Sequence, residues 1–252
     1  MQRDRQSAEP HGRPSAAASA ASRSRPSSAS VELIRFARPK PGVNLLTIRG
    51  FSPNTSPEKL HQIFSECGLI DNLVIYKSDD RSRGSWATVQ YFSSGECSLC
   101  LHSNNGRVVD GAFLSVYPMP SGTNRSQRPA EDVPQLSASK GIDMMNHFVG
   151  FSKWSHEVLS IRRQALQGVT ANGQQRPAAE AVARVRVSCP GGVTIEREGV
   201  GTPGEGGQLG HAPKQAVTNA LKAALCGLAI VRWPSGKVAV RLLPEPSVDA
   251  AG

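Results

Sequence analysis

The chain has 252 residues and a formal net charge of +9 at pH 7, so its length allows one or two domains. Five cysteines without a disulfide-framework spacing indicate a reduced, intracellular protein. No apolar run reaches the roughly 18 residues that span a membrane, and the N-terminus lacks the apolar core of a signal peptide. These features exclude a membrane protein and a disulfide-stapled secreted domain.

Residues 1–42 are predicted to form a disordered basic tail. Ser, Ala, Arg and Pro dominate the first 30 positions, and such a segment buries too little apolar surface to offset its chain entropy. Arg23, Ser24 and Arg25 resemble a short RS element. This element is either a nuclear address that also contacts nucleic acid weakly or part of a solvated tail. Order is expected to begin near Val43.

Residues 43–120 are predicted to fold as one split-βαβ domain. The expected elements alternate in the order β-α-β-β-α-β, which defines this ferredoxin-like α+β fold. Strands are predicted at 46–49, 73–76, 86–92 and 113–117, and helices at 55–67 and 96–103. Thr55 and Glu58 have the spacing of a capping box at the start of the first helix.

This domain resembles the RNA-recognition motif (RRM), a family that stacks bases on aromatic side chains of its central strands. Residues 46–51 and 84–91 occupy the places of the two strand motifs of that family. The resemblance implies base stacking on Trp86, with Thr47 and Thr88 where the family usually has two further rings. Arg49 and Arg83 are candidate phosphate contacts. By strand alternation Trp86 faces outward, where it stacks on a base or docks another protein or the other domain.

Cys97 and Cys100 have a CxxC spacing. A zinc site needs four ligands, and no second pair lies nearby in the sequence. A redox pair is expected at a helix N-terminus, whereas this pair falls inside a predicted packing helix. We therefore predict two buried thiols and no metal site.

Residues 121–141 are rich in Pro, Ser, Gly, Gln and Asn and are predicted to be a linker. A second domain is expected over 142–243, followed by a tail at 244–252. The second domain is predicted to contain three antiparallel strands at 154–161, 182–188 and 193–195, with a last hairpin strand at 237–242. A helix over 213–230 is expected to pack against the sheet through its apolar stripe.

Three segments of this second domain resemble the strand-annealing core of the recombination mediator Rad52. They are the residues 148–154, the glycines that follow Glu198, and the helix residues 214–225. An RRM joined to this motif is the layout of the Rad52 motif-containing proteins. The resemblance implies binding of single-stranded DNA and RNA in the DNA-damage response, in the nucleus and also in the cytoplasm and nucleolus. It also allows a homo-oligomer and contacts with recombination or repair proteins.

Basic residues of the second domain are the candidate contacts to a nucleic-acid backbone. The resemblance places Lys222 at the position of a helix lysine that contacts single-stranded DNA. Arg184 and Arg186 share one face of a predicted strand, and Lys214 lies near the edge of the polar helix face. Such a set favours a groove that follows the phosphate backbone.

The run from Gly199 to Gly204 fits GxGxxG, but Pro203 interrupts it and no helix opens from it. We therefore predict a flexible loop and no dinucleotide site. No nucleophile with a nearby base and no acidic cluster is present at motif spacing, so we expect neither an enzyme nor a cofactor. The sequence predicts a nucleic-acid-binding repair protein. The alternative is a protein-interaction adaptor of a repair complex, in which the RRM does not bind RNA.

Overall fold

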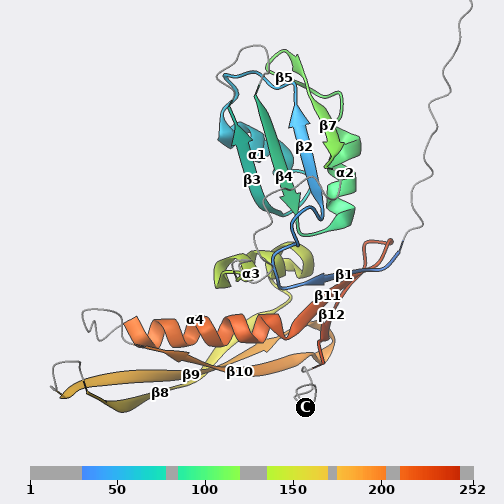
Figure 1. Cartoon of the computed structure of the whole chain (residues 1–252). Coiled ribbons are helices and arrows are strands. Elements are labelled where there is room, and N and C mark those ends of the chain that lie inside the picture. Colours follow the sequence, from blue (N-terminus) through green and yellow to red (C-terminus); the bar gives the residue numbers. More distant parts are fainter. Residues whose placement is uncertain (1–29, 78–84, 120–134, 170–174, 203–210, 245–252) are drawn as a thin grey trace, which may run out of the picture. The chain divides into compact units, whose positions relative to one another are not determined.

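The computed structural model describes residues 30–77, 85–119, 135–169, 175–202 and 211–244 (Figure 1). The predictions for residues 1–29, linker residues 121–134, the tail from residue 245 and Arg83 lie outside these ranges. No helix in the described part of the chain is long and apolar enough to cross a membrane.

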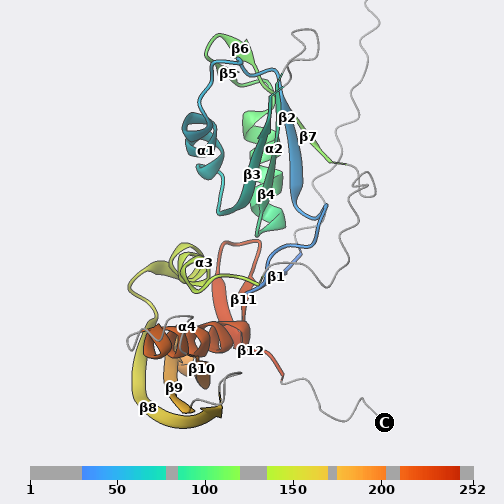
Figure 2. The ribbon, with the colours of Figure 1, turned by 60° about the vertical axis from the view of Figure 1, so that its left-hand side comes forward.

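The first half contains the expected RRM fold. A four-stranded antiparallel sheet has the strand order β3-β4-β2-β7, and both helices cover the same face of it (Figure 2). Its elements are β2 (Leu45–Arg49), α1 (Pro57–Ser65), β3 (Ile70–Tyr76), β4 (Trp86–Tyr91), α2 (Ser94–Asn104), the hairpin β5 (Val108–Val109) and β6 (Ala112–Phe113), and β7 (Ser115–Pro118).

Alternation along β4 sets the two faces of this sheet, as predicted. Ala87, Val89 and Tyr91 are fully buried against the helices, together with Leu60 and Phe64 of α1. The start of α1 differs by one residue from the predicted capping box. Ser56 is the N-cap and accepts a hydrogen bond from the Lys59 amide at 3.2 Å, because the Thr55 hydroxyl instead donates to Asp110 at 3.0 Å.

The second half contains the predicted antiparallel sheet with a helix packed on it. The sheet has the order β10-β9-β8, and α4 lies along it in Figure 1. The elements are α3 (Ala138–Met144), a π-helix (Met145–Gly150), β8 (Ser155–Val169), β9 (Gln175–Ser188), a 3-10 turn (Pro190–Gly192), β10 (Thr194–Gly201), α4 (His211–Cys226), β11 (Leu228–Arg232) and β12 (Val238–Leu242).

Glycine and alanine bring β10 and α4 into close contact. A Cβ atom added at Gly199 would lie 2.1 Å from the backbone nitrogen of Ala220, and one at Gly201 would lie 2.0 Å from the carbonyl oxygen of Ala212. The prediction of a loop is therefore wrong for residues 199–201, which end β10. Glycine is required here because backbone packs on backbone, and not because the chain is flexible.

The helix predicted to end at Ile230 ends at Cys226. The Gly227 amide donates to the carbonyl oxygens of Ala223 and Ala224, both at 3.2 Å, and this bifurcated bond closes the helix. The chain then enters β11, whose Leu228 and Ile230 are fully buried. Apolar residues continue from α4 into β11, so the spacing of apolar residues in the sequence did not reveal where the helix ends.

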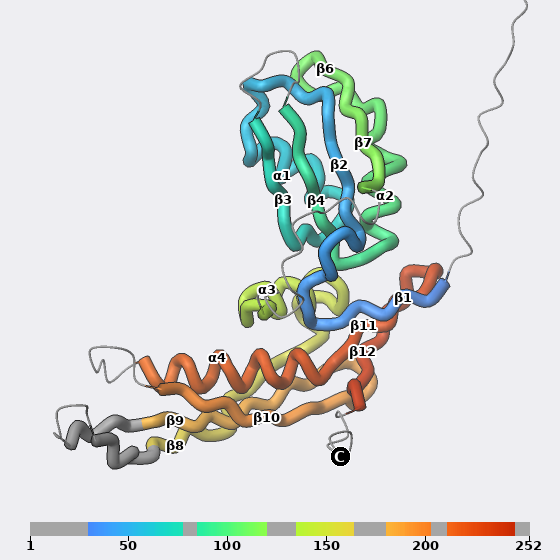
Figure 3. Tube along the Cα trace, in the orientation of Figure 1, coloured from blue at the N-terminus to red at the C-terminus, as the bar shows by residue number. Residues whose placement is uncertain are grey.

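A strand precedes the RRM where the sequence predicted a disordered tail. β1 (Glu32–Arg35) pairs antiparallel with β11, and β12 lies on the other side of β11 (Figure 3). Ile34 is 3% exposed and pairs with Ile230. The prediction of disorder up to residue 42 is therefore wrong for this segment. A four-residue strand has almost no sequence signal, and its partner lies at the far end of the chain.

Two carboxylates lie at the N-terminus of α2, one from β1 and one from α2 itself. Glu32 of β1 accepts from the Ser93 hydroxyl at 2.7 Å and the Ser94 hydroxyl at 2.8 Å. Glu96, which is 5% exposed, accepts from the Leu69 amide at 3.0 Å and bonds His147 of the π-helix at 2.6 Å. These bonds satisfy carboxylates that would be costly to bury without partners.

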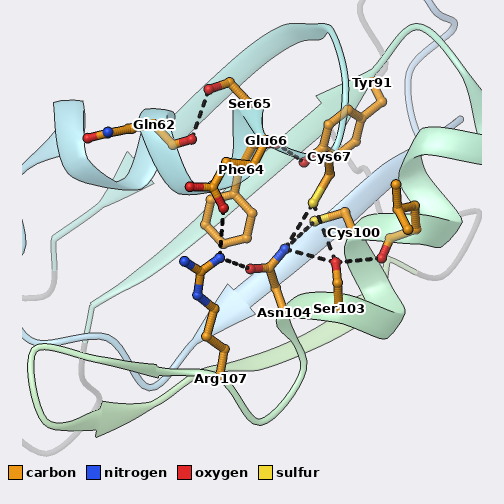
Figure 4. Close-up of polar contacts among 11 residues, drawn as sticks. Gln62, Phe64, Ser65, Glu66, Cys67, Tyr91, Cys100, Ser103, Asn104 and Arg107 are labelled. Atoms are coloured by element: carbon orange, nitrogen blue, oxygen red, sulfur yellow. Dashed lines mark hydrogen bonds and ion pairs between the residues drawn. The ribbon is translucent and has the colours of Figure 1, made fainter.

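The CxxC pair lies inside α2, as predicted. Burial raises the pKa of Cys97 to about 11 and that of Cys100 to about 12. Figure 4 shows the Asn104 amide directed at two sulfur atoms, with Nδ2 at 3.0 Å from Sγ of Cys67 and 3.7 Å from Sγ of Cys100. The thiolate is the form that attacks disulfides and binds metals, so at neutral pH these thiols act as packed, protonated side chains.

Candidate nucleic-acid interface

The open face of the RRM sheet is the first candidate surface, because α1 and α2 cover only the other face. The strand register places Tyr76 opposite Trp86, and Trp86 opposite Arg49. The rings of Tyr76 and Trp86 stack, with centroids 3.9 Å apart and planes at 11°. Tyr76 is exposed and Trp86 is half-buried. Two rings rather than one therefore form an aromatic platform at this end of the sheet.

Thr47 and Thr88 lie in the middle of the same face. They pair directly across β2 and β4, with Val74 and Tyr117 as their outer neighbours on β3 and β7. Thr47 is only 5% exposed and Thr88 only 8%. These side chains fill the space between larger neighbours and offer little surface to a ligand.

Arg49 and Tyr117 form the third part of this face. The Arg49 guanidinium lies 5.8 Å from the centroid of the Tyr117 ring, within the range of a cation–π contact. Arg49 is exposed and has no acidic partner among the described residues. Its position agrees with the predicted phosphate contact. Sequence reasoning missed Tyr76 and Tyr117, although both alternate with core residues in their own strands and so share the face of Trp86.

The outer face of the second sheet differs in its electrostatics. Arg184 and Arg186 share this face, as predicted, but both bind Glu196 on the neighbouring strand, at 3.1 Å and 2.7 Å. Glu157 of β8 lies 3.8 Å from Arg186. The charges of the two arginines are therefore largely compensated, and phosphate would have to compete with these carboxylates.

Lys222 lies in a groove along α4. The groove encloses about 610 Å³ and is lined by side chains of α4, of the segment after β1 and of the segment before α3. No acidic residue in the described ranges pairs with Lys222. Its charge lowers the pKa of the neighbouring Cys226 thiol, although burial raises that pKa by more. Lys222 is thus an uncompensated cation in a concave surface.

Lys214 occupies the first half of α4 and is exposed. It does not line the groove that contains Lys222, so the structure does not bring the two helix lysines together. Within the described ranges no three His, Cys, Asp or Glu side chains lie close enough to hold a metal ion.

Comparison with family models identifies both halves of the chain. Residues 46–115 match the RNA recognition motif, and residues 114–231 match the Rad52/22 family of double-strand break repair proteins. The chain is therefore an RRM followed by a Rad52/22-family region. A curated relative is RAD52 motif-containing protein 1 of Gallus gallus, which is 26% identical over 230 residues, covering 83% of this chain and 79% of that protein.

Solved RRM structures cover about a third of this chain. The third RRM of Pes4 is 23% identical and covers 33% of this chain and 99% of that chain, with a TM-score of 0.29. The RRM of Rna15 with bound RNA (GU) is 16% identical and covers 33% of this chain and 88% of that chain, with a TM-score of 0.28.

Proposed function

We propose that this protein binds single-stranded DNA and RNA, without catalysis, as part of DNA repair or recombination. The observation that carries the proposal is the open RRM sheet face, where the stacked rings of Tyr76 and Trp86 lie beside Arg49, a cation with no acidic partner in the described part of the chain. An aromatic platform beside a cation is the arrangement that binds unpaired bases and their phosphates.

The RRM contribution rests on stacking more than on charge. Stacking contributes about 1–3 kcal/mol per base, and the block 43–118 holds six Lys or Arg against seven Asp or Glu. Its long-range attraction for phosphate is therefore small. We infer that this face contacts few bases and has weak sequence specificity.

The second contribution comes from Lys222. A cation that lines a groove and lacks a counterion releases salt ions from a nucleic-acid backbone when it binds there. We propose that Lys222 is the principal backbone contact of the Rad52/22-family region. Arg184, Arg186 and Lys214 are secondary contacts in this proposal, since two are ion-paired and one lies outside the groove.

The family matches bear on the cellular location of this activity. A repair-family region is consistent with the nucleus as the main location, and we extend the proposal to the cytoplasm and nucleolus. Recombination or repair proteins are proposed partners, as is a second copy of the chain in a homo-oligomer.

Fluorescence anisotropy of the full chain tests the proposal, with labelled single-stranded DNA and RNA over about 50–200 mM salt. Trp86→Ala should weaken RNA binding about 5- to 150-fold with little change in salt slope. Lys222→Ala should weaken binding on all sequences and lower the slope by about one. Thr88→Val serves as the control, because that side chain is only 8% exposed. If the unmodified chain binds neither probe at low salt, the proposal is wrong.

A protein-interaction adaptor is the second candidate, and one observation favours it. Phe113 is 71% exposed and pairs across its hairpin with Val108, which is 53% exposed. This apolar pair is suited to a protein surface rather than to a phosphate backbone. Nuclease-resistant capture of a repair protein that Phe113→Ser abolishes would support this candidate, provided that nucleic-acid binding is absent.

A further inference from the structure

The groove beside Lys222 contains a second cation that the sequence did not single out. Arg38, from the segment between β1 and β2, lines the same groove. Phe36 and Leu136, which are 2% and 9% exposed, form part of its apolar wall. The groove therefore combines two cations with an apolar surface, and these features come from three separate stretches of the chain.

The hydrogen bonds of Arg38 leave most of its donors available. Its Nε atom donates to both carboxylate oxygens of Asp71, at 3.1 Å and 3.2 Å. A guanidinium has four further N–H groups on its two terminal nitrogens, and no acceptor for them is recorded among the described residues. The Asp71 side chain is 5% exposed, whereas that of Arg38 is 30% exposed. Asp71 thus fixes the guanidinium from its buried side.

We propose that Arg38 and Lys222 bind the same phosphate of a single-stranded nucleic acid, so that the segment before the RRM completes a backbone site on α4. This inference rests on the proposed function and adds to it a residue outside both family matches, which begin at residue 46. The planar fork of Arg38 bonds two phosphate oxygens, and the Lys222 ammonium supplies a point charge to the same group.

Charge and shape favour a strand over a free anion as the occupant. Arg38 is partly neutralised by Asp71, so one inorganic phosphate would meet little more than the charge of Lys222. A strand adds the contact of its sugar and base with the exposed groove residues Ala37, Ala223 and Cys226. The groove of about 610 Å³ is large enough for a nucleotide-sized group.

A double-mutant cycle on the full chain tests the shared phosphate. The probe is a labelled oligothymidylate of about 20 nucleotides, and the variants are Arg38→Ala, Lys222→Ala and both together. Each single change should weaken binding about three- to tenfold and lower the salt slope by about one. The double variant should lose clearly less than the product of the two losses, because partners of one group do not act independently.

Two control variants separate this role from simpler ones. Lys40→Ala removes an exposed charge from the same segment without touching the groove, and should change affinity less than twofold. Asp71→Asn breaks the ion pair but keeps the Arg38 cation. If Arg38 contacts phosphate, Asp71→Asn should leave the affinity for the oligonucleotide unchanged or should raise it. A loss of affinity equal to that of Arg38→Ala, with an equal fall in the unfolding temperature of both variants, would mean that Arg38 only stabilises the fold, which overturns the inference.

The outcomes also separate this inference from the proposed function. If the unmodified chain does not bind the oligonucleotide, the proposed function fails. If it binds and Arg38→Ala behaves like Lys40→Ala, or if the losses of Arg38→Ala and Lys222→Ala simply multiply, only the shared site is wrong. We expect millimolar inorganic phosphate to displace the oligonucleotide no more than chloride does at the same ionic strength. Displacement well beyond that would indicate a free-anion site instead.

Discussion

The RRM and the Rad52/22-family region each pack helix against an antiparallel sheet, but they fill the space between those layers differently. Large side chains such as Phe64, Leu60 and Tyr91 occupy the RRM core. In the second region Ala183, Ala216 and the glycines of β10 line the contact with α4. The second region thus adds a close approach of backbones at the glycines of β10 to a cluster of large buried side chains that includes Phe148, Leu225 and Ile230.

The two sheets also differ on the faces that carry no helix. The RRM face presents aromatic rings beside Arg49, which has no acidic partner within the ranges that the structure describes, whereas the second face pairs Arg184 and Arg186 with Glu196. Two domains that both pack helices on an antiparallel sheet can therefore differ in the charge of their open sheet faces. A strand pattern predicts which residues share a face, but the partner strand decides whether their charges are available.

A substitution in the close contact of β10 with α4 should cause the largest loss of unfolding free energy. Gly199→Val would add a branched side chain at a position where even a Cβ atom would lie 2.1 Å from the Ala220 nitrogen. Because backbone atoms cannot move aside as side chains do, we expect a loss of more than about 3 kcal/mol in unfolding free energy. Thermal and urea unfolding of the full chain measure it.

Val200→Ala is the matched control, since this neighbour lies on the other face of β10 and is 46% exposed. It should change the free energy of unfolding by less than about 0.5–1 kcal/mol. Equal losses for the two variants would contradict the assignment of a close-packed contact to the glycine face.

A smaller effect is expected from a hydrogen bond in the RRM core. Tyr91 is fully buried and its hydroxyl donates to the Phe64 carbonyl oxygen at 2.8 Å. Tyr91→Phe leaves that carbonyl without this donor and should cost about 1–3 kcal/mol. Tyr117→Phe on the open face should cost much less. Similar unfolding midpoints for both variants would show that the buried bond contributes little.

The smallest effect concerns the compensated arginines. Glu196→Gln removes the carboxylate that pairs with Arg184 and Arg186, so affinity for single-stranded DNA should rise severalfold at low salt and the salt slope should steepen. Glu198→Gln changes net charge equally, but no ion pair of Glu198 is recorded in the described part of the chain. A rise of the same size for Glu198→Gln would mean that net charge, and not release of the arginines, controls binding.

Local patterns were enough to predict the RRM and most of the second sheet. The buried alternation of Ala87, Val89 and Tyr91 follows from the period of a strand, and the apolar stripe of α4 from the period of a helix. Gly199 was misassigned to a loop, since the same residue type serves turns and close backbone contacts. The sequence could not distinguish these without knowing what lies opposite.

The candidate surfaces were less predictable than the fold. Trp86 lies on the open face of the RRM sheet and Lys222 lines a groove, but the stacking of Tyr76 on Trp86 depends on the register between β3 and β4. The pairing of Arg186 with Glu196 depends on another register. Arg38 could not be found at all, because it shares a groove with Lys222 only through the three-dimensional course of the chain.

The pairing of β1 with β11 determines how this gene can be divided for expression. A plasmid or an alternative transcript that starts at residue 43 would remove one side of the β1-β11-β12 sheet. The unpaired amides and carbonyls of β11 would then be a template for aggregation. An in-frame excision between Phe36 and Gln135 would keep β1 and β11 on one polypeptide, and is the better route to the repair-family region without its RRM.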